Sequence, residues 1–320
     1  MKIRLHYDIE VEKPTLVAGW PGMGNVGIGA VDFLRRHVSA EDFGEIDMRE
    51  HFTPEAIVVE HGIAKLPEMP SNNFAYSRRP NLIFFLSEAQ VSGPAALTLT
   101  NLIVDFAEQL EVQRIYTCAA FAVPISYTEQ TKVLGVATNE SLRDSLTPHG
   151  PEILGQGMIS GLNGLLLGVA GARGIESACL LATIPQYAIS LPNPRGSRAL
   201  VETLGALLGV EPDVSEFDAS VRQMDNVMAQ VEERMRTAFE SSEVEHEEGE
   251  EIVEEPPPSD ENEVPNYVMK RIESLFRQVA RDREQAARLK EELDKWGLYE
   301  LYEDRFLDLF RRGGEESDET

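Results

Sequence analysis

Cysteine is scarce in this chain of 320 residues, which contains only Cys118 and Cys179. Two cysteines cannot build the disulfide framework of a small secreted domain, and they do not form the C-x-x-C pair of many metal sites. Both fall in apolar stretches that we expect to form buried strands. We therefore predict two reduced thiols that pack in the core of a cytoplasmic protein.

Long hydrophobic runs are missing as well. The longest apolar stretch, residues 162–172, is about half as long as a membrane-spanning helix needs to be. The first residues also lack the cationic start and apolar core of a secretory signal. These two absences lead us to expect a cytoplasmic location and no membrane partner.

Positive charge is in short supply, because 29 Lys and Arg residues stand against 55 Asp and Glu residues, for a net charge of −26. Nucleic acids and anionic membranes bind to basic surfaces, so we expect neither as a partner. Much of the excess is local. Residues 243–263 contain eleven acidic residues and no Lys or Arg, and the last six residues add four more acids.

Motifs for catalysis and metal binding are also lacking. The six histidines show no ligand spacing such as H-x-x-x-H. The sequence has neither the G-x-S-x-G turn of a serine hydrolase nor the G-x-x-x-x-G-K-[ST] loop of a nucleoside triphosphatase. We therefore assign no catalytic residue, no metal site and no cofactor, and this inventory favours a protein that is not an enzyme.

The most distinctive feature that is present is a glycine-rich turn between an apolar strand at residues 16–20 and an amphipathic helix. Gly22, Gly24 and Gly27 match the pattern G-x-G-x-x-G. Backbone N–H groups at such a turn can approach a phosphate group, because glycine has no Cβ and the helix dipole favours an anion. The candidate ligands are these three glycines and Asn25.

The same glycines have a second interpretation, in which they only allow a tight turn and close packing of the helix on the sheet. A dinucleotide site would also need an acidic residue about 20 positions later, at the end of the second strand. Asp47 or Glu50 could serve, but the segment 47–52 is charged rather than apolar. We therefore favour the packing interpretation.

These residues also carry a family resemblance. The segment GWPGMGNVG, followed by IGAVDFL, resembles the opening signature of the proteasome assembly chaperone 2 family, in its archaeal and bacterial branch. Other segments are similar in the same order, so that the likeness covers about residues 1–240. They are FFLSEAQ at 84–90, KVLGVATNESL at 132–142, MISGLNGLLLG at 158–168 and LLATIPQYAISLPNPRGSRALVETL at 180–204.

The resemblance implies an α/β core similar to that of nucleoside phosphorylases, and a function exercised through protein contacts. Some archaeal relatives dock on proteasome rings through a C-terminal tail of a hydrophobic residue, tyrosine and one further residue. This chain ends in Ser317, Asp318, Glu319 and Thr320. We therefore do not expect docking by that route.

The pattern of apolar residues predicts the same fold class. Buried strands are expected at 81–86, 114–123, 131–138 and 177–183, and a short strand at 157–160. Helices are expected at 95–110, 162–172 and 198–208. Strands that alternate with helices at this spacing indicate a mostly parallel mixed sheet with helices on both faces.

The last third of the chain differs in kind. We predict an α/β core domain over 1–212, a long helix over 213–240, a disordered acidic linker over 241–264, a helical segment over 265–312 and an acidic tail over 313–320. Apolar residues recur every three or four positions in both helical segments, as in a coiled coil. These stripes pack on their own α/β body, on each other or on a neighbouring subunit.

Two functions are compatible with the sequence. The first is a non-enzymatic, homo-oligomeric scaffold or assembly-chaperone-like protein with a protein client. The second is an enzyme or sensor that binds a phosphate-bearing small molecule, such as a nucleoside or nucleotide, at the glycine-rich turn. The chemistry-poor sequence and the apolar helical stripes favour the first.

Overall fold

A computed structural model describes residues 1–49, 51 and 57–244, together with 272, 275, 276, 279, 286–295, 298, 302 and 306. The chain divides into two compact units, Met1–Glu248 and Gly249–Thr320. Most of the predicted acidic linker (241–264), the whole of the predicted tail (313–320), Glu50 and His246 lie outside the described residues.

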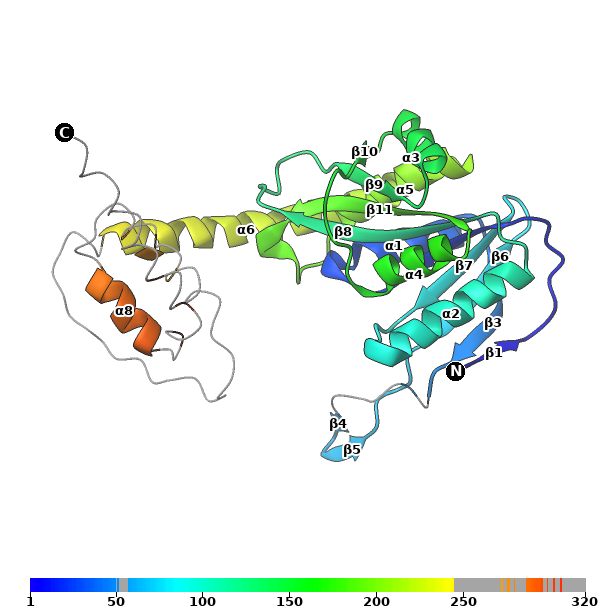
Figure 1. Cartoon of the computed structure of the whole chain (residues 1–320), viewed down its shortest axis with the longest axis horizontal. Coiled ribbons are helices and arrows are strands. Elements are labelled where there is room, and N and C mark those ends of the chain that lie inside the picture. Colours follow the sequence, from blue (N-terminus) through cyan, green and yellow to red (C-terminus); the bar gives the residue numbers. More distant parts are fainter. Residues whose placement is uncertain are drawn as a thin grey trace, which may run out of the picture. The chain divides into compact units, whose positions relative to one another are not determined.

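The main sheet of the first unit has nine strands among the described residues (Figure 1). Its central strands β7, β2, β8 and β11 run parallel, and the flanking strands β6 and β9 run antiparallel to them. In order across the sheet, the strands are β1 (Lys2–Leu5), β3 (Glu41–Asp47), β6 (Asn72–Ser77), β7 (Leu82–Ser87), β2 (Thr15–Gly19), β8 (Arg114–Val123), β11 (Glu176–Pro185), β9 (Val133–Ala137) and β10 (Glu152–Ile153). A separate hairpin joins β4 (Val58–Glu60) to β5 (Ile63–Lys65).

Helices cover both faces of the sheet. Helices α1 and α5 pack on one face, and α2 and α4 lie side by side on the other, as Figure 1 shows. The described helices are α1 (Val26–His37), α2 (Gly93–Gln109), α3 (Glu140–Leu146), α4 (Gly161–Ala172), α5 (Pro194–Leu208), α6 (Phe217–Val244) and α8 (Ala286–Lys295). The short 3-10 turns are η1 (Met23–Asn25), η2 (Thr147–His149), η3 (Gln186–Ala188) and η4 (Val214–Glu216).

The predicted α/β fold, with a mixed sheet between two helical layers and a C-terminal helical extension, is therefore confirmed. Strand β2 shows why it forms: Val17 packs in the core under α1 and α5, whereas Leu16 and Ala18 pack under α2 and α4. A strand buried on both faces must be apolar throughout. The likeness of the core to nucleoside phosphorylases stays a prediction.

Two details of the sequence prediction are wrong. Residues 157–160 form no strand, and the chain instead pairs at β10, before Gly155 and Gly157 interrupt the extended pattern. The strand predicted at 131–138 exists as β9, but it runs antiparallel to β11. Its carboxyl end therefore lies at the edge of the sheet opposite to the carboxyl ends of the central strands.

The two cysteines are buried thiols, as predicted, and neither forms a disulfide. Cys118 lies on β8 and Cys179 on β11, each with no exposed surface. Burial raises the pKa of Cys179 to about 12 and holds that of Cys118 well above its usual range. Both side chains thus act as small apolar groups in the core.

The first turn of α1 lies directly against the backbone of β8. A Cβ atom placed on Gly27 would lie 2.0 Å from the carbonyl oxygen of Cys118 and 2.6 Å from its carbonyl carbon. No side chain fits at such a distance. Gly22, in contrast, has an extended backbone (φ −173°) and open space around the position of its Cβ.

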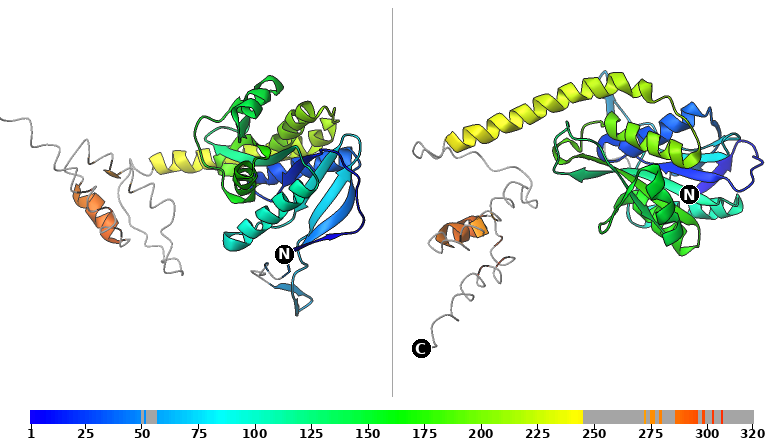
Figure 2. Two further views of the ribbon diagram at one scale, coloured as in Figure 1. Left: turned by 45° about the vertical axis from the view of Figure 1, so that its right-hand side comes forward. Right: turned by 90° about the horizontal axis from the view of Figure 1, so that it is seen from above.

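The apolar stripe predicted from residue 214 onward runs into α6, and its first half packs on the α/β body. The ring of Phe217 lies 4.8 Å from that of Phe33 on α1, and Met228 is buried. Met235 is 39% exposed. Figure 2 shows α6 continuing beyond the body of the first unit.

Polar contacts hold the packed half of α6 in place. Glu232 accepts hydrogen bonds from the Tyr127 backbone N–H (3.0 Å), the Ser126 hydroxyl (3.1 Å) and the Tyr187 hydroxyl. Burial opposes ionisation of Glu232, but these three donors outweigh it and lower the pKa of the carboxyl group. An ion pair between Arg195 on α5 and Asp225 on α6 (2.6 Å) adds a further contact.

The second unit has an apolar core of its own among its described residues. Leu289 and Leu293 on α8 are fully buried against apolar side chains from the preceding and following segments, and the rings of Phe276 and Tyr302 lie 5.7 Å apart. The C-terminal apolar stripe therefore packs within its own unit. The buried members are Ile272, Leu275, Phe276, Val279, Leu289, Leu293, Leu298 and Phe306.

The contact between α1 and β8 predicts that adding a single methyl group at Gly27 strongly lowers the stability of the fold. We expect Gly27→Ala to lower the free energy of unfolding by about 3 kcal/mol, because α1 must move away from β8 to make room. Gly22→Ala is the matched control and should change it by less than about 0.5 kcal/mol. Denaturant unfolding measures both, and equal stabilities would contradict the close approach.

The hydrogen bonds to Glu232 predict that the packing of α6 depends on pH. Because the pKa of Glu232 is lowered by folding, its contribution is present above the unfolded pKa of about 4.3 and is lost as the pH falls through the lower folded value. The protection factors of the amides of residues 217–237, which compare the observed exchange rate with the intrinsic rate at the same pH, should therefore fall in acid.

Substitution of the carboxylate tests the same contact at neutral pH. Glu232→Gln should speed this exchange about fivefold, corresponding to a loss of about 1 kcal/mol in local stability. Glu233→Gln is the control, because Glu233 is exposed and bonds to Arg236 within α6. If the two variants exchange at the same rate, Glu232 does not hold the helix.

Candidate protein-interaction surface

The carboxyl ends of the central parallel strands lie at one edge of the sheet, and the loops that follow them form a common surface. The glycine-rich turn follows β2, the segment 88–92 follows β7, and η3 follows β11. In open α/β sheets this edge is the usual place of a binding site. We call it the carboxyl-end surface.

The glycine-rich turn is tied to neighbouring backbone on this surface. Gly24 (φ 62°) donates its N–H to the carbonyl of Ile189 and accepts the N–H of Asn193, both at 2.8 Å. Asn25 (φ 51°) donates its N–H to the carbonyl of Gly22 at 2.9 Å. Two of the four candidate ligand positions thus use their amides within the protein.

Asp47, one of the two acids expected for a dinucleotide site, is not beside this turn. Asp47 ends β3, and two strands, β6 and β7, separate β3 from β2. Hydrogen bonds from Arg49 hold the pKa of the Asp47 carboxyl group well below its usual range, and Arg4 pairs with it at 2.6 Å. Asp47 is therefore occupied in a surface ion-pair cluster.

Gln90 joins three segments of the carboxyl-end surface. Its side-chain amide donates to the carbonyl of Pro21 in the glycine-rich turn (2.7 Å), and its Oε1 accepts the N–H of Leu162 at the start of α4 (3.4 Å). Glu88, two residues earlier, accepts the N–H of Ser71 at 2.8 Å. Both side chains hold loops in position.

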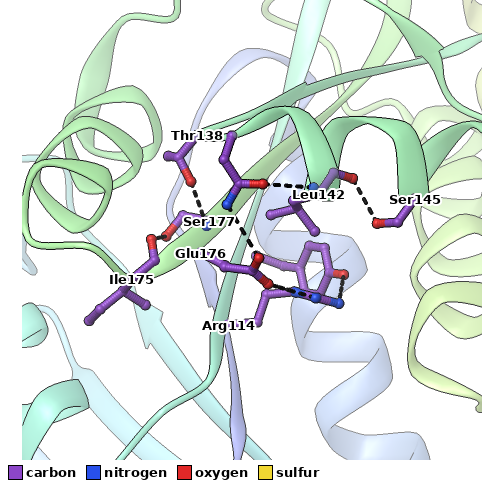
Figure 3. A network of polar contacts seen from close by, with 9 residues as sticks. Arg114, Thr138, Leu142, Ser145, Ile175, Glu176 and Ser177 are labelled. Atoms are coloured by element: carbon purple, nitrogen blue, oxygen red, sulfur yellow. Dashed lines mark hydrogen bonds and ion pairs between the residues drawn. The ribbon is translucent and has the colours of Figure 1, made fainter.

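Asn139 and Glu140, which also follow a predicted strand, lie at the opposite edge because β9 is antiparallel. Asn139 caps α3 by accepting the N–H of Leu142 (2.8 Å), and its amide donates to Glu176 (3.3 Å). Figure 3 shows this network, in which Arg114 pairs with Glu176 at 2.7 Å. The reversed direction of β9 therefore takes these polar groups away from the carboxyl-end surface.

Large apolar side chains are exposed on the carboxyl-end surface. Met23 lies in the glycine-rich turn, Ile189 follows η3, Leu97 lies in the first turns of α2, and Met158 precedes α4 and is 93% exposed. Each follows the end of a central strand or lies near the start of a helix at that edge. Exposed apolar groups that gather in one region mark interaction sites.

The hairpin of β4 and β5 leaves the same edge, because β3 runs in the same direction as β7. Pairing of Val59 with Ala64 places these two on one face, and alternation along the strands adds Ile57 and Leu66. Ile57, Val59 and Leu66 are 58%, 62% and 77% exposed. This all-apolar, exposed face is the hairpin face.

No cluster of three or more His, Cys, Asp or Glu side chains suited to a metal ion occurs among the described residues. None of the described helices is long and apolar enough to cross a lipid bilayer.

These features define a class of α/β protein with a mixed sheet. Exposed apolar residues at the carboxyl ends of its central strands form a surface suited to protein contacts. Comparison with known families identifies the group. The chain belongs to the PAC2 family, whose model matches residues 16–232. The resemblance seen in the sequence is thereby confirmed.

The chain is also similar to a known protein and to solved structures. An uncharacterised protein of Methanocaldococcus jannaschii is 28% identical over 229 residues, which cover 70% of this chain and 85% of that protein. The fold is similar to that of Pyrococcus furiosus PbaB, an archaeal proteasome activator (TM-score 0.61, 22% identity, 72% of this chain and 98% of PbaB). It is also similar to P. furiosus PbaA, an archaeal homolog of proteasome-assembly chaperone (0.59, 23%, 77% and 98%).

The backbone bonds of the glycine-rich turn generate a prediction about small molecules. Because Gly24 and Asn25 use their amides within the protein, we expect nucleosides, nucleotides and NAD at 1 mM (roughly the upper end of metabolite affinities) to leave the melting temperature unchanged. The variant Asn25→Asp adds a negative charge where a phosphate would bind. A rise in melting temperature that occurs in the unmodified chain and is abolished in this variant would contradict the expectation. Asn139→Asp, at the opposite edge, is the control.

Proposed function

We propose that this protein works by protein contact, as a homo-oligomeric scaffold of the assembly-chaperone type in the cytoplasm. The observation that carries the proposal is the concentration of exposed apolar side chains on the carboxyl-end surface and the hairpin face. A two-stranded hairpin is marginally stable alone in water, and covering its apolar face would stabilise it. Catalysis would instead call for converging titratable groups, and Gln90 and Glu88 at this edge bond to backbone N–H and C=O groups.

The family suggests which client to test first. PbaB is an archaeal proteasome activator and PbaA an archaeal homolog of proteasome-assembly chaperone. We propose proteasome subunits as clients of this chain as well, with the hairpin face in the contact. The acidic charge of the chain supports a role that involves neither nucleic acid nor anionic membranes.

A charge placed on the hairpin face tests the proposal. The full chain should self-associate in light scattering and co-elute with purified proteasome subunits of the source organism. The double variant Val59→Asp, Leu66→Asp should raise the dissociation constant for the proteasome subunits about thirtyfold and so reduce co-elution. The reason is that burying these two residues contributes about 2 kcal/mol or more at a contact.

The control for this experiment is Ile153→Asp, which charges an exposed apolar residue on β10, the last strand in the order across the sheet and far from β3 and β6 in that order. It should behave as the unmodified chain. A monomeric full chain that binds no proteasome subunit would overturn the proposal. Equal effects of the hairpin variant and Ile153→Asp would remove the hairpin face from it.

A further inference from the structure

An open groove of about 710 Å³ runs between α1 and the outer strands of the sheet, at the carboxyl-end surface. Helix α1 packs over β2, β7 and β8, so β6 and β3 extend beyond it and form the floor. On the side of the sheet that faces α1, Asn73 pairs with Leu86 across β6 and β7. The volume falls within the range of about 300–1,000 Å³ that is usual for ligand sites.

The lining of the groove combines apolar surface with negative charge. Ile28 on α1 and Leu86 on β7 supply partly exposed apolar groups. Three carboxylates line it, those of Asp32, Asp42 and Glu88. They stand against the guanidinium of Arg35 in the lining and that of Arg36, which pairs with Asp32 at 3.0 Å, so one net negative charge remains.

The charged groups are held in place by defined contacts. Arg35 lies between Asp32 (3.0 Å) and Asp42 (3.6 Å), which ties α1 to β3 across the groove. Glu88 is fixed by the Ser71 N–H. The side chains of Asp32 and Asp42 are 40% and 48% exposed, so both remain accessible to a partner.

The groove is continuous along the chain with the hairpin region. Ser71 lines the groove, and Met69, two residues earlier, is an exposed apolar residue at the base of the hairpin. A partner that covers the hairpin face therefore also comes close to the groove. This continuity links the groove to the proposed function, on which the following inference rests.

We propose that the groove binds an extended segment of a partner protein in which basic side chains alternate with apolar ones. Successive side chains of an extended segment point to opposite sides. Apolar side chains can then contact Ile28 and Leu86, while Lys or Arg side chains reach Asp42 and Glu88. The net negative charge of the lining selects against acidic segments.

A labelled peptide tests the groove directly. The probe is a fluorescein-labelled peptide of alternating Leu and Arg, measured by anisotropy with the full chain in 150 mM salt. Peptides with every Arg changed to Glu, or every Leu changed to Ser, should bind about tenfold more weakly or not at all. Equal binding of either one overturns the proposal.

Variants of the protein locate the site. Asp42→Asn combined with Glu88→Gln should weaken binding of the Leu–Arg peptide about tenfold. The matched control, Glu140→Gln combined with Glu152→Gln, removes two exposed carboxylates on α3 and β10, outside the groove, and should bind as the unmodified chain does. If both pairs weaken binding equally, the peptide responds only to the overall charge and the groove is not its site.

Two further measurements separate the possible failures. Spermidine carries the positive charge without apolar groups, and displacement of the peptide by an equal concentration of spermidine would identify a polyamine site instead. The hairpin variant Val59→Asp, Leu66→Asp should still bind the peptide. If the unmodified chain does not bind the peptide but does co-elute with proteasome subunits, the groove proposal alone is overturned. If it binds the peptide but does not co-elute with proteasome subunits, the proposed function alone is overturned.

Discussion

The approach of α1 to the backbone of β8 is the constraint on which the rest of the first unit depends. At Gly27 there is no room for a Cβ between the helix and the carbonyl of Cys118. This contact fixes the height of α1 above the sheet, and with it the position of the glycine-rich turn that precedes the helix. Gly24, in that turn, bonds to Ile189 and Asn193, so two glycines together link the central strands to the start of α5.

Strand direction decides what each edge of the sheet can do. The four central strands end together, and their loops carry the exposed apolar residues of the carboxyl-end surface. Because β9 is reversed, Asn139 instead joins Arg114 and Glu176 in a polar network at the other edge. The ion pairs there link strand ends, and the apolar groups at the first edge remain without a described partner in the chain.

Much of the fold follows from the sequence, because burial on both faces leaves a clear signal. Strands such as β2 and β8 are mostly apolar, and the glycine-rich turn marks where a helix begins. The direction of β9 could not be read, since apolar content is the same for parallel and antiparallel pairing. The hairpin face was hidden for a related reason: Val59 and Leu66 have the composition of a core strand, and only their neighbours in space reveal their exposure.

The described apolar residues of the second unit pack among themselves, and residues 249–320 lie beyond the stretch that the PAC2 family model matches, 16–232. Substitutions inside one core leave the other core unaffected. The two parts are therefore free to diverge at different rates. A lineage can alter or replace the C-terminal addition while the inherited sheet, with the surface at its strand ends, stays the same.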